Sequence, residues 1–233
     1  MRTILMLLFW AITTPIAALI AFPWTFITRS ADFLYWCGIS LAHVGLRISG
    51  IRLRLHGLDR LDAAGTYIFM SNHASNIDPP ALIPILPRRT SVLVKKELFR
   101  IPVLGQAMRI GSLVPVDRSN RERAIASLDA ATAVIQSGKN MTIFVEGTRS
   151  HTGKLLAFKK GPFYLAMRTQ VPVVPVTITN TYVLQPKGQF FATPGTVDII
   201  FHPPIPPEQF GDNDELMAKV RSAIASALPP ELR

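Results

Sequence analysis

Residues Tyr67–Pro80 read YIFMSNHASNIDPP and join a short apolar run to a helix-start signal. The run Tyr67–Met70 has the length and the aromatic and aliphatic composition of a buried strand. Asp78 followed by Pro79 is typical of a helix start, because aspartate is a common N-cap and proline is favoured at the first helical position. A strand that passes through a polar turn into a helix is the repeating unit of α/β folds.

The chain after Gly50 repeats this alternation. In Ile51–His56, apolar residues alternate with Arg and His, the pattern of a half-buried strand. Further short apolar runs lie at Ser91–Val94, Leu113–Val116, Met141–Val145, Val173–Ile178 and Val197–Phe201. Helical patterns separate several of them, including Arg121–Ile135. We therefore predict an α/β fold with a mixed, mainly parallel sheet flanked by helices.

The carboxyl-terminal region ends in another predicted helix, roughly Asn213–Leu228. Asp212 stands at the N-cap position and Glu215 follows three residues later, which is a capping-box pattern. Its apolar positions, spaced three or four apart, indicate a face that packs on the core.

The amino-terminal region differs from the rest in composition. Thr3–Thr28 has no charged residue and exceeds the roughly 20 apolar residues that a membrane-spanning helix needs. Pro15 and Pro23 could break it into shorter pieces. A second apolar run, Phe33–Leu46, is too short for an ordinary span and indicates a buried or interfacial helix.

Three interpretations of this region compete. Arg2 and several small alanines fit a cleaved signal peptide, but the apolar run is long for one. A helix inside a soluble core fits poorly, because the run has two tryptophans and no polar face. We favour membrane attachment through residues 1–49, by one span or by a re-entrant two-helix motif. Residues 50–233 would then form the catalytic domain.

Charge and cysteine content narrow the function classes. The net charge is +10, and residues 88–160 hold fourteen Lys or Arg against five Asp or Glu. A basic field of this kind attracts phosphate groups, nucleic acid or an anionic membrane surface. Nucleic acid is disfavoured, because few aromatic residues are interleaved with the basic ones. The single cysteine, Cys37, excludes an intramolecular disulfide, and five scattered histidines support no metal site.

His73 and Asp78 are the first candidates for chemistry. An imidazole titrates near neutral pH, and a carboxylate on its other nitrogen would fix the tautomer and stabilise the imidazolium. Each residue also has an ordinary explanation: Asp78 as an N-cap, His73 as a partly buried histidine. A turn can bring the two side chains together, with Asn72 and Ser75 supplying further polar groups.

Two further polar blocks follow apolar strands. In Phe144–Ser150, Gly147 permits close backbone approach, Thr148 offers a hydroxyl and Arg149 offers a bidentate fork for phosphate. In Gly111–Arg118, a strand again ends in a charged pair. The ordinary alternative for Phe144–Ser150 is a polar turn with an exposed Glu–Arg pair, and that for Gly111–Arg118 is a salt bridge at the end of a strand.

Four blocks in this order resemble the glycerolipid acyltransferase family that includes 1-acylglycerol-3-phosphate acyltransferases. They are Asn72–Asp78, Gly111–Arg118, Phe144–Ser150 and Val171–Val176, and the resemblance extends from about residue 50 to residue 207. The family motifs are Asn-His-x-x-x-x-Asp, Gly…Asp-Arg, Phe-Pro-Glu-Gly-Thr-Arg-Ser and Val-Pro-x-x-Pro-Val.

The resemblance implies a reaction and a catalytic pair. His73 would be the general base that deprotonates an acceptor hydroxyl, and Asp78 its orienting partner. The hydroxyl would attack the thioester of acyl-CoA or acyl carrier protein, a co-substrate, with no cofactor and no metal. Val145 departs from the family proline but leaves the Glu-Gly-Thr-Arg core intact. Pro115 departs from the usual aromatic or aliphatic residue, which could affect acceptor fit.

The same resemblance implies binding residues and partners. The expected acceptor is lysophosphatidic acid, and the product phosphatidic acid for phospholipid synthesis. The residues expected to shape its phosphate site are Glu146, Gly147, Thr148, Arg149 and Arg118. Membrane lipids are the other expected partner, at the inner or cytoplasmic membrane with the catalytic domain facing the cytoplasm.

Three alternatives remain open from the sequence. The same mechanism could act on another lysolipid, such as a lyso-aminolipid. Water could replace the acceptor, which would make the protein an esterase. The charge surplus alone would also fit a non-catalytic, basic protein that binds membrane surfaces.

Overall fold

The computed structural model describes residues 2–117 and 121–233. Its helices are α1 (Arg2–Thr28), α2 (Asp32–Ile48), α3 (Asp78–Leu82), α4 (Leu104–Ile110), α5 (Arg121–Gln136), α6 (Lys160–Thr169), α7 (Thr181–Leu184) and α8 (Asn213–Ser226). Its strands are β1 (Ile51–His56), β2 (Ile68–Ser71), β3 (Thr90–Lys95), β4 (Val114–Val116), β5 (Asn140–Phe144), β6 (Val173–Ile178) and β7 (Gly195–Phe201). Each predicted strand is present.

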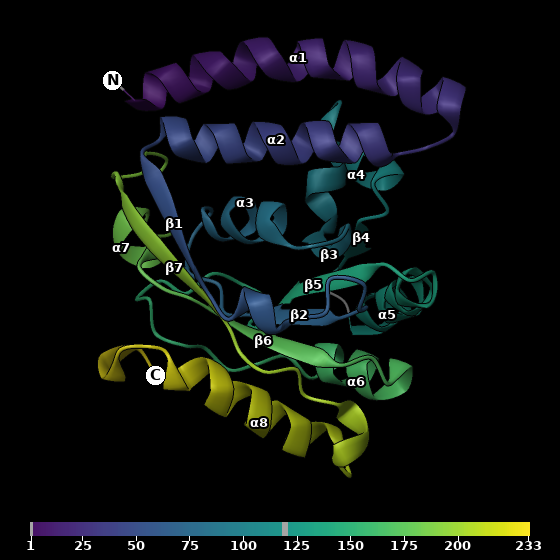
Figure 1. Cartoon of the computed structure of the whole chain (residues 1–233), viewed down its shortest axis with the longest axis vertical. Helices are drawn as coiled ribbons and strands as arrows, with labels where there is room; N and C mark the ends of the chain where they lie inside the picture. Colours follow the sequence, from purple (N-terminus) through teal and green to yellow (C-terminus); the bar gives the residue numbers. More distant parts are fainter. Residues whose placement is uncertain (1, 118–120) are drawn as a thin grey trace.

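In the described part of the chain, seven strands form one sheet in the order β1-β7-β6-β2-β5-β3-β4 (Figure 1). Neighbouring strands run parallel throughout except for β6 and β7, which are antiparallel. The prediction of a mixed, mainly parallel sheet is confirmed.

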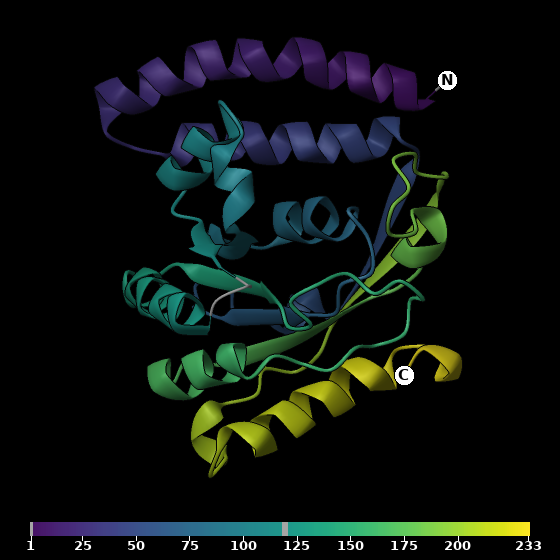
Figure 2. The same ribbon diagram turned by 180° about the vertical axis from the view of Figure 1, so that it is seen from behind.

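Helices cover both faces of the sheet. In both views α2 and α3 lie on one side, and α6 and α8 lie on the other (Figures 1 and 2). Ile68 and Met70 of β2 belong to the core beneath α5, α6 and α8, whereas Phe69 belongs to the core beneath α2 and α3. All three side chains are fully buried. A strand buried on both faces needs a continuous apolar run, which explains why Tyr67–Met70 shows no alternation.

The amino-terminal helices form an antiparallel pair above the sheet, with α2 next to the sheet and α1 outside it (Figure 1). They approach closely, since a Cβ on Gly45 would lie 2.4 Å from the indole nitrogen of Trp10. α1 is one uninterrupted helix, so Pro15 and Pro23 do not divide it. A proline removes one backbone hydrogen bond, which can bend a long helix without ending it.

The outer surface of α1 is apolar and exposed. Within Ile4–Thr28, an 18-residue window has a mean hydropathy of 2.3, and only 6% of that window is buried. Leu19 and Phe26 are 77% and 87% exposed. Among the described residues, this is the one helix whose length and composition would suit a membrane span.

The start of α8 follows its sequence signal. The Asp212 side chain accepts hydrogen bonds from the backbone N–H groups of Asp214 and Glu215, at 2.8 and 2.9 Å. Glu215 reaches back to the N–H of Gly211 instead of that of Asp212. The predicted N-cap is confirmed, and the reciprocal arm of the capping box is shifted by one residue.

Candidate active site

Three strand ends bring the sequence blocks together. β2 is hydrogen-bonded in parallel to both β5 and β6, so Ser71 lies opposite Phe144 on one side and Val176 on the other. The segments that follow these strands therefore start from the same edge of the sheet. In open α/β sheets this carboxyl edge is where ligands bind.

His73 and Asp78 form a hydrogen-bonded pair. The distance between His73 Nδ1 and Asp78 Oδ2 is 2.7 Å. The same Asp78 oxygen accepts the backbone N–H groups of Ala74 and Ser75, at 2.7 and 2.8 Å. The Asp78 side chain is fully buried, and the His73 side chain is 13% exposed. The turn between β2 and α3 thus aligns the two groups.

The ordinary N-cap explanation does not account for the Asp78 carboxylate. Asp78 is the first residue of α3, and the residue at the N-cap, Ile77, makes no side-chain capping bond. The carboxylate bonds to amides that precede the helix, so it faces back toward the imidazole. Its role in this structure is to hold the His73 ring and turn.

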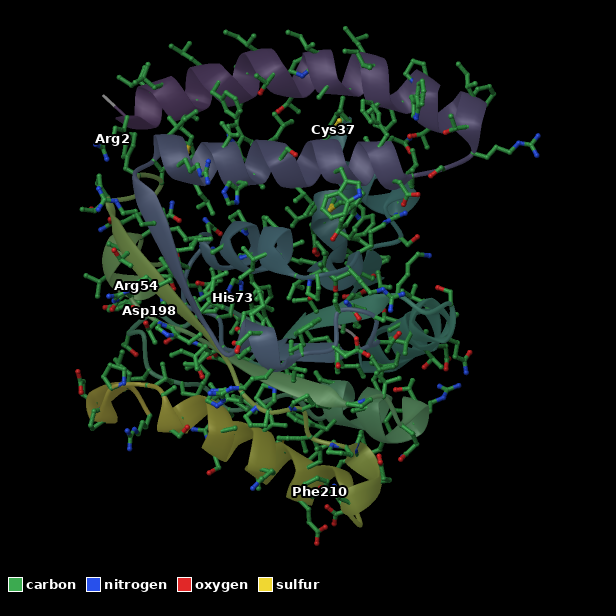
Figure 3. The ribbon with its side chains drawn as sticks, in the orientation of Figure 1. Arg2, Cys37, Arg54, His73, Asp198 and Phe210 are labelled. Carbon is green, nitrogen blue, oxygen red and sulfur yellow. The ribbon has the colours of Figure 1, made fainter. Side chains whose placement is uncertain are left out.

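The imidazole ring of His73 stacks on the ring of Phe144. The two ring centroids lie 4.3 Å apart with an interplanar angle of 28°. Among the described residues the Nε2 atom of His73 has no hydrogen-bond partner. With Nδ1 donating to the carboxylate, Nε2 is the nitrogen that can accept a proton. Figure 3 shows His73 on the side of the sheet that carries α3.

Glu146 lies behind the histidine and contacts the backbone. Its Oε1 accepts the N–H of His73 at 2.7 Å, and its Oε2 accepts the N–H of Leu156 at 2.9 Å. The residue is 2% exposed. Burial raises the pKa of Glu146 to about 7, although the two backbone N–H groups favour the carboxylate. The Glu146 carboxyl therefore binds backbone N–H groups and does not face the open phosphate site that the sequence had led us to expect.

The turn after Glu146 is shaped by Gly147, whose φ of 68° lies in the left-handed region. A Cβ at Gly147 would lie 3.1 Å from Cγ of Lys159. Thr148 is exposed and Arg149 is half-buried. Ser150 then donates its N–H to the carbonyl of His73 at 2.9 Å. The His73 backbone is thus held at both its N–H and its carbonyl by one block.

Other side chains tie the blocks to distant segments. The Asn72 amide exchanges two 2.8 Å hydrogen bonds with the backbone of Ile178. The Ser75 hydroxyl donates to Oε1 of Gln185 at 3.2 Å. Lys187 Nζ lies 2.9 Å from the carbonyl of Arg149. No local pattern in the sequence marks Gln185 or Lys187, so neither residue was predicted to belong to the site.

Comparisons with known proteins agree with this arrangement. The family model described as Acyltransferase matches residues 52–179, more than half of the chain. The chain belongs to the acyltransferase family. The resemblance stated from the four blocks is therefore confirmed.

Members of the acyltransferase family with specific names are similar to this chain. A 1-acyl-sn-glycerol-3-phosphate acyltransferase from Limnanthes douglasii is 35% identical over 184 residues, which cover 78% of this chain and 64% of the relative. The alpha form from Homo sapiens is 28% identical over 187 residues, covering 80% and 65%. The chain thus spans just under two thirds of each relative's length.

A solved structure of the acyltransferase family has a similar fold. The 1-acyl-sn-glycerophosphate (LPA) acyltransferase PlsC from Thermotoga maritima superposes with a TM-score of 0.78 at 28% identity. The similarity covers 97% of this chain and 95% of that one. It therefore includes the amino-terminal helices as well as the sheet.

Val116 of the Gly111–Arg118 block lines a cavity in this acyltransferase-family chain. Arg118 lies outside the described residues, and its neighbour Asp117 accepts a hydrogen bond from Lys96 Nζ at 2.5 Å. A cavity of about 800 Å³ includes Phe144 and Gly147 in its wall and continues between α5 and α6. Its remaining lining is mainly apolar: Leu93, Val116, Leu128, Ile143, Val145, Pro162 and Tyr164, with Lys159, Lys160, Gly161 and Asn213.

Proposed function

We propose that this protein transfers an acyl chain from an acyl thioester to the free hydroxyl of 1-acylglycerol-3-phosphate, giving phosphatidic acid. The observation that carries the proposal is the 2.7 Å His73–Asp78 pair at the carboxyl edge of the sheet. Membership of the acyltransferase family and the names of similar proteins support the reaction class and acceptor. Acyl-CoA or acyl carrier protein would be the donor.

The hydrogen-bonded pair supports the following proton transfers. His73 Nε2 takes the proton of the acceptor hydroxyl as its oxygen attacks the thioester carbonyl. The carbon–sulfur bond then breaks, and the departing sulfur receives that proton from the imidazolium as a thiol. Asp78 keeps the Nδ1 proton in place and stabilises the positive charge on the ring. General-base catalysis of this kind supplies ~10² to 10⁴-fold.

The acceptor phosphate would bind at the turn after β5. Among the described residues the Arg149 guanidinium has no hydrogen bond or ion pair, so its planar fork is available for a phosphate. Gly147 and Thr148 would bring a backbone and a hydroxyl to the same anion, and Arg118 would add a second cation. Glu146 would act differently from its neighbours, by positioning the His73 backbone.

The cavity beside Gly147 suits an acyl chain. Its volume of about 800 Å³ falls within the range of ~300 to 1,000 Å³ typical of ligand pockets, and most of its lining is apolar. Phe144, which stacks on His73, is also one of the residues that line this cavity. A chain held there would therefore lie next to a residue that contacts the imidazole.

The exposed apolar surface of α1 would deliver the enzyme to its lipid substrate. Burying such a surface in lipid is favourable at about 25 cal/mol per Å². The basic middle of the chain would then meet anionic headgroups. We propose location at the inner or cytoplasmic membrane, with the sheet domain facing the cytoplasm.

One experiment tests the reaction and the acceptor together. Purified protein in detergent is given acyl-CoA, then acyl carrier protein thioester, with a mixed pool of lysolipids, and products are identified by mass spectrometry. The expected product is phosphatidic acid, absent with the His73→Ala variant. Preference for an acceptor without a phosphomonoester would refute the proposed substrate, and normal turnover by His73→Ala would refute the proposed base.

A further inference from the structure

The loop between α7 and β7 brings a cation to the turn proposed to bind phosphate. Lys187 Nζ lies 2.9 Å from the carbonyl of Arg149 and 3.4 Å from the hydroxyl of Thr148. Lys187 is half-buried, so its position is restricted by its surroundings. It lies 38 residues beyond Arg149 in the chain and outside the 52–179 match.

Hydrogen bonds hold this loop against the catalytic turn. The Gln185 side chain accepts the hydroxyl proton of Ser75 at 3.2 Å and donates to the carbonyl of Phe190 at 3.0 Å. At the end of the loop, Thr193 donates its N–H to the carbonyl of Leu184 at 2.8 Å. Gln185 and Lys187 therefore contact the two blocks that meet around His73, one block each. A loop fixed in this way can place a charge with precision.

The charges around Lys187 leave it suited to an anion. An ammonium has three donors, and two of them face the Arg149 carbonyl and the Thr148 hydroxyl. In the described part of the chain, Lys187 has no carboxylate partner within 4.0 Å. The buried carboxylate of Glu146, on the same turn, is directed at backbone amides instead.

We propose that Lys187 is a further binding residue for the acceptor phosphate, which it grips together with Arg149. This inference rests on the proposed function and extends it to a residue outside the four sequence blocks. A phosphomonoester near neutral pH carries close to two negative charges, so the Lys187 ammonium beside the turn would add to the positive charge that the arginines supply. Selectivity for a phosphorylated acceptor over a neutral one would then depend on the Lys187 charge.

A purely structural role for Lys187 is the competing explanation, and substitutions separate the two. Lys187→Gln retains a donor for the Arg149 carbonyl but has no charge. Lys187→Arg retains the charge. Lys219→Ala, on an exposed position of α8, is the matched control for loss of a lysine far from the turn.

The measurement compares 1-acylglycerol-3-phosphate with the monoacylglycerol of the same chain, at fixed donor. A hydrogen bond to a charged group contributes enough that its loss should raise KM for the phosphorylated acceptor roughly tenfold or more. We expect this in Lys187→Gln, with kcat and the KM for monoacylglycerol nearly unchanged. Lys187→Arg and Lys219→Ala should resemble the wild type.

Direct binding keeps the test independent of turnover. Binding of sn-glycerol 3-phosphate to the solubilised protein should weaken to the same extent in Lys187→Gln. If wild-type turnover is normal and Lys187→Gln leaves KM and binding unchanged, the inference fails while the proposed function stands. Equal losses with both acceptors would show a structural role and also overturn it. A wild-type protein that binds no phosphomonoester would overturn both.

Discussion

Replacing Glu146 with glutamine tests the electrostatics behind His73. The carboxyl is buried, and its pKa is raised from an ordinary value of 4.5 to about 7 because burial disfavours the charged form. That difference corresponds to about 3 kcal/mol, at about 1.4 kcal/mol per pKa unit. Between pH 4.5 and 7 the folded protein holds more of this proton than the unfolded chain does. The wild-type free energy of unfolding therefore falls, by up to this amount, as the pH rises.

Glu146→Gln has no proton to lose and does not share this decline. The amide has one acceptor oxygen, so either the His73 or the Leu156 N–H loses its partner, at about 1 to 3 kcal/mol at every pH. This constant cost cancels when two pH values are compared. Relative to the wild type, the variant should gain about 3 kcal/mol from pH 4.5 to pH 8.

Melting temperature in detergent provides the assay. For a chain of this size 1 kcal/mol corresponds to roughly 2 to 4 °C, so the wild-type-minus-variant difference should change by roughly 6 to 12 °C between the two pH values. Glu208→Gln, at an exposed site, should shift the melting temperature by little at either pH. A wild-type-minus-variant difference that stays constant, or that increases from pH 4.5 to pH 8, would refute the reasoning. In kinetic assays, Glu146→Gln should lower kcat rather than raise KM, because the Glu146 carboxyl faces the His73 backbone.

Three further substitutions test separate parts of the structure. Asp78→Asn should lower kcat by roughly 10³ to 10⁴-fold, because a neutral amide neither stabilises the imidazolium charge nor enforces the tautomer with the proton on Nδ1. Circular dichroism should remain that of a folded protein, and a loss below tenfold would contradict the pairing. Gly147→Ala should lower both melting temperature and kcat/KM for two reasons. Its φ lies in the left-handed region, and its new Cβ would lie 3.1 Å from Cγ of Lys159. Gly138→Ala has a similar φ with open space around it, so it should lower only the melting temperature. Gly45→Val should separate α1 from α2, since its Cβ would lie 2.4 Å from Trp10, and limited proteolysis should then cut between the helices faster than in the wild type.

Local patterns were sufficient to predict most of the fold. The seven strands and the helices α5 and α8 lie where apolar periodicity placed them, because the strands in the middle of a covered sheet are apolar over their length, whereas the edge strand β1 alternates apolar and polar residues. The two prolines left open whether α1 is one helix or shorter pieces, and in the structure it is one helix. Proline chemistry is local, whereas the continuity of α1 also depends on its packing along α2.

The site was predictable only in part, for a geometric reason. The His73–Asp78 spacing lies on one turn, so a single stretch of sequence carries it. Whether the Glu146 carboxyl faces a substrate or the backbone depends on the position of Leu156, whose N–H donates to it. The Glu-Gly-Thr-Arg motif carries no information about that position. Gln185 reaches Ser75 from 110 positions away, so this contact depends on the tertiary fold.

Two buried carboxylates converge on one histidine, and each lowers stability where it lies. Oδ1 of Asp78 has no hydrogen-bond partner, and burial makes the charged form of Glu146 unfavourable. Both carboxylates contact His73, one through the ring and one through the backbone N–H. The position and tautomer of that imidazole are therefore what these residues maintain, as expected if His73 is the proposed general base.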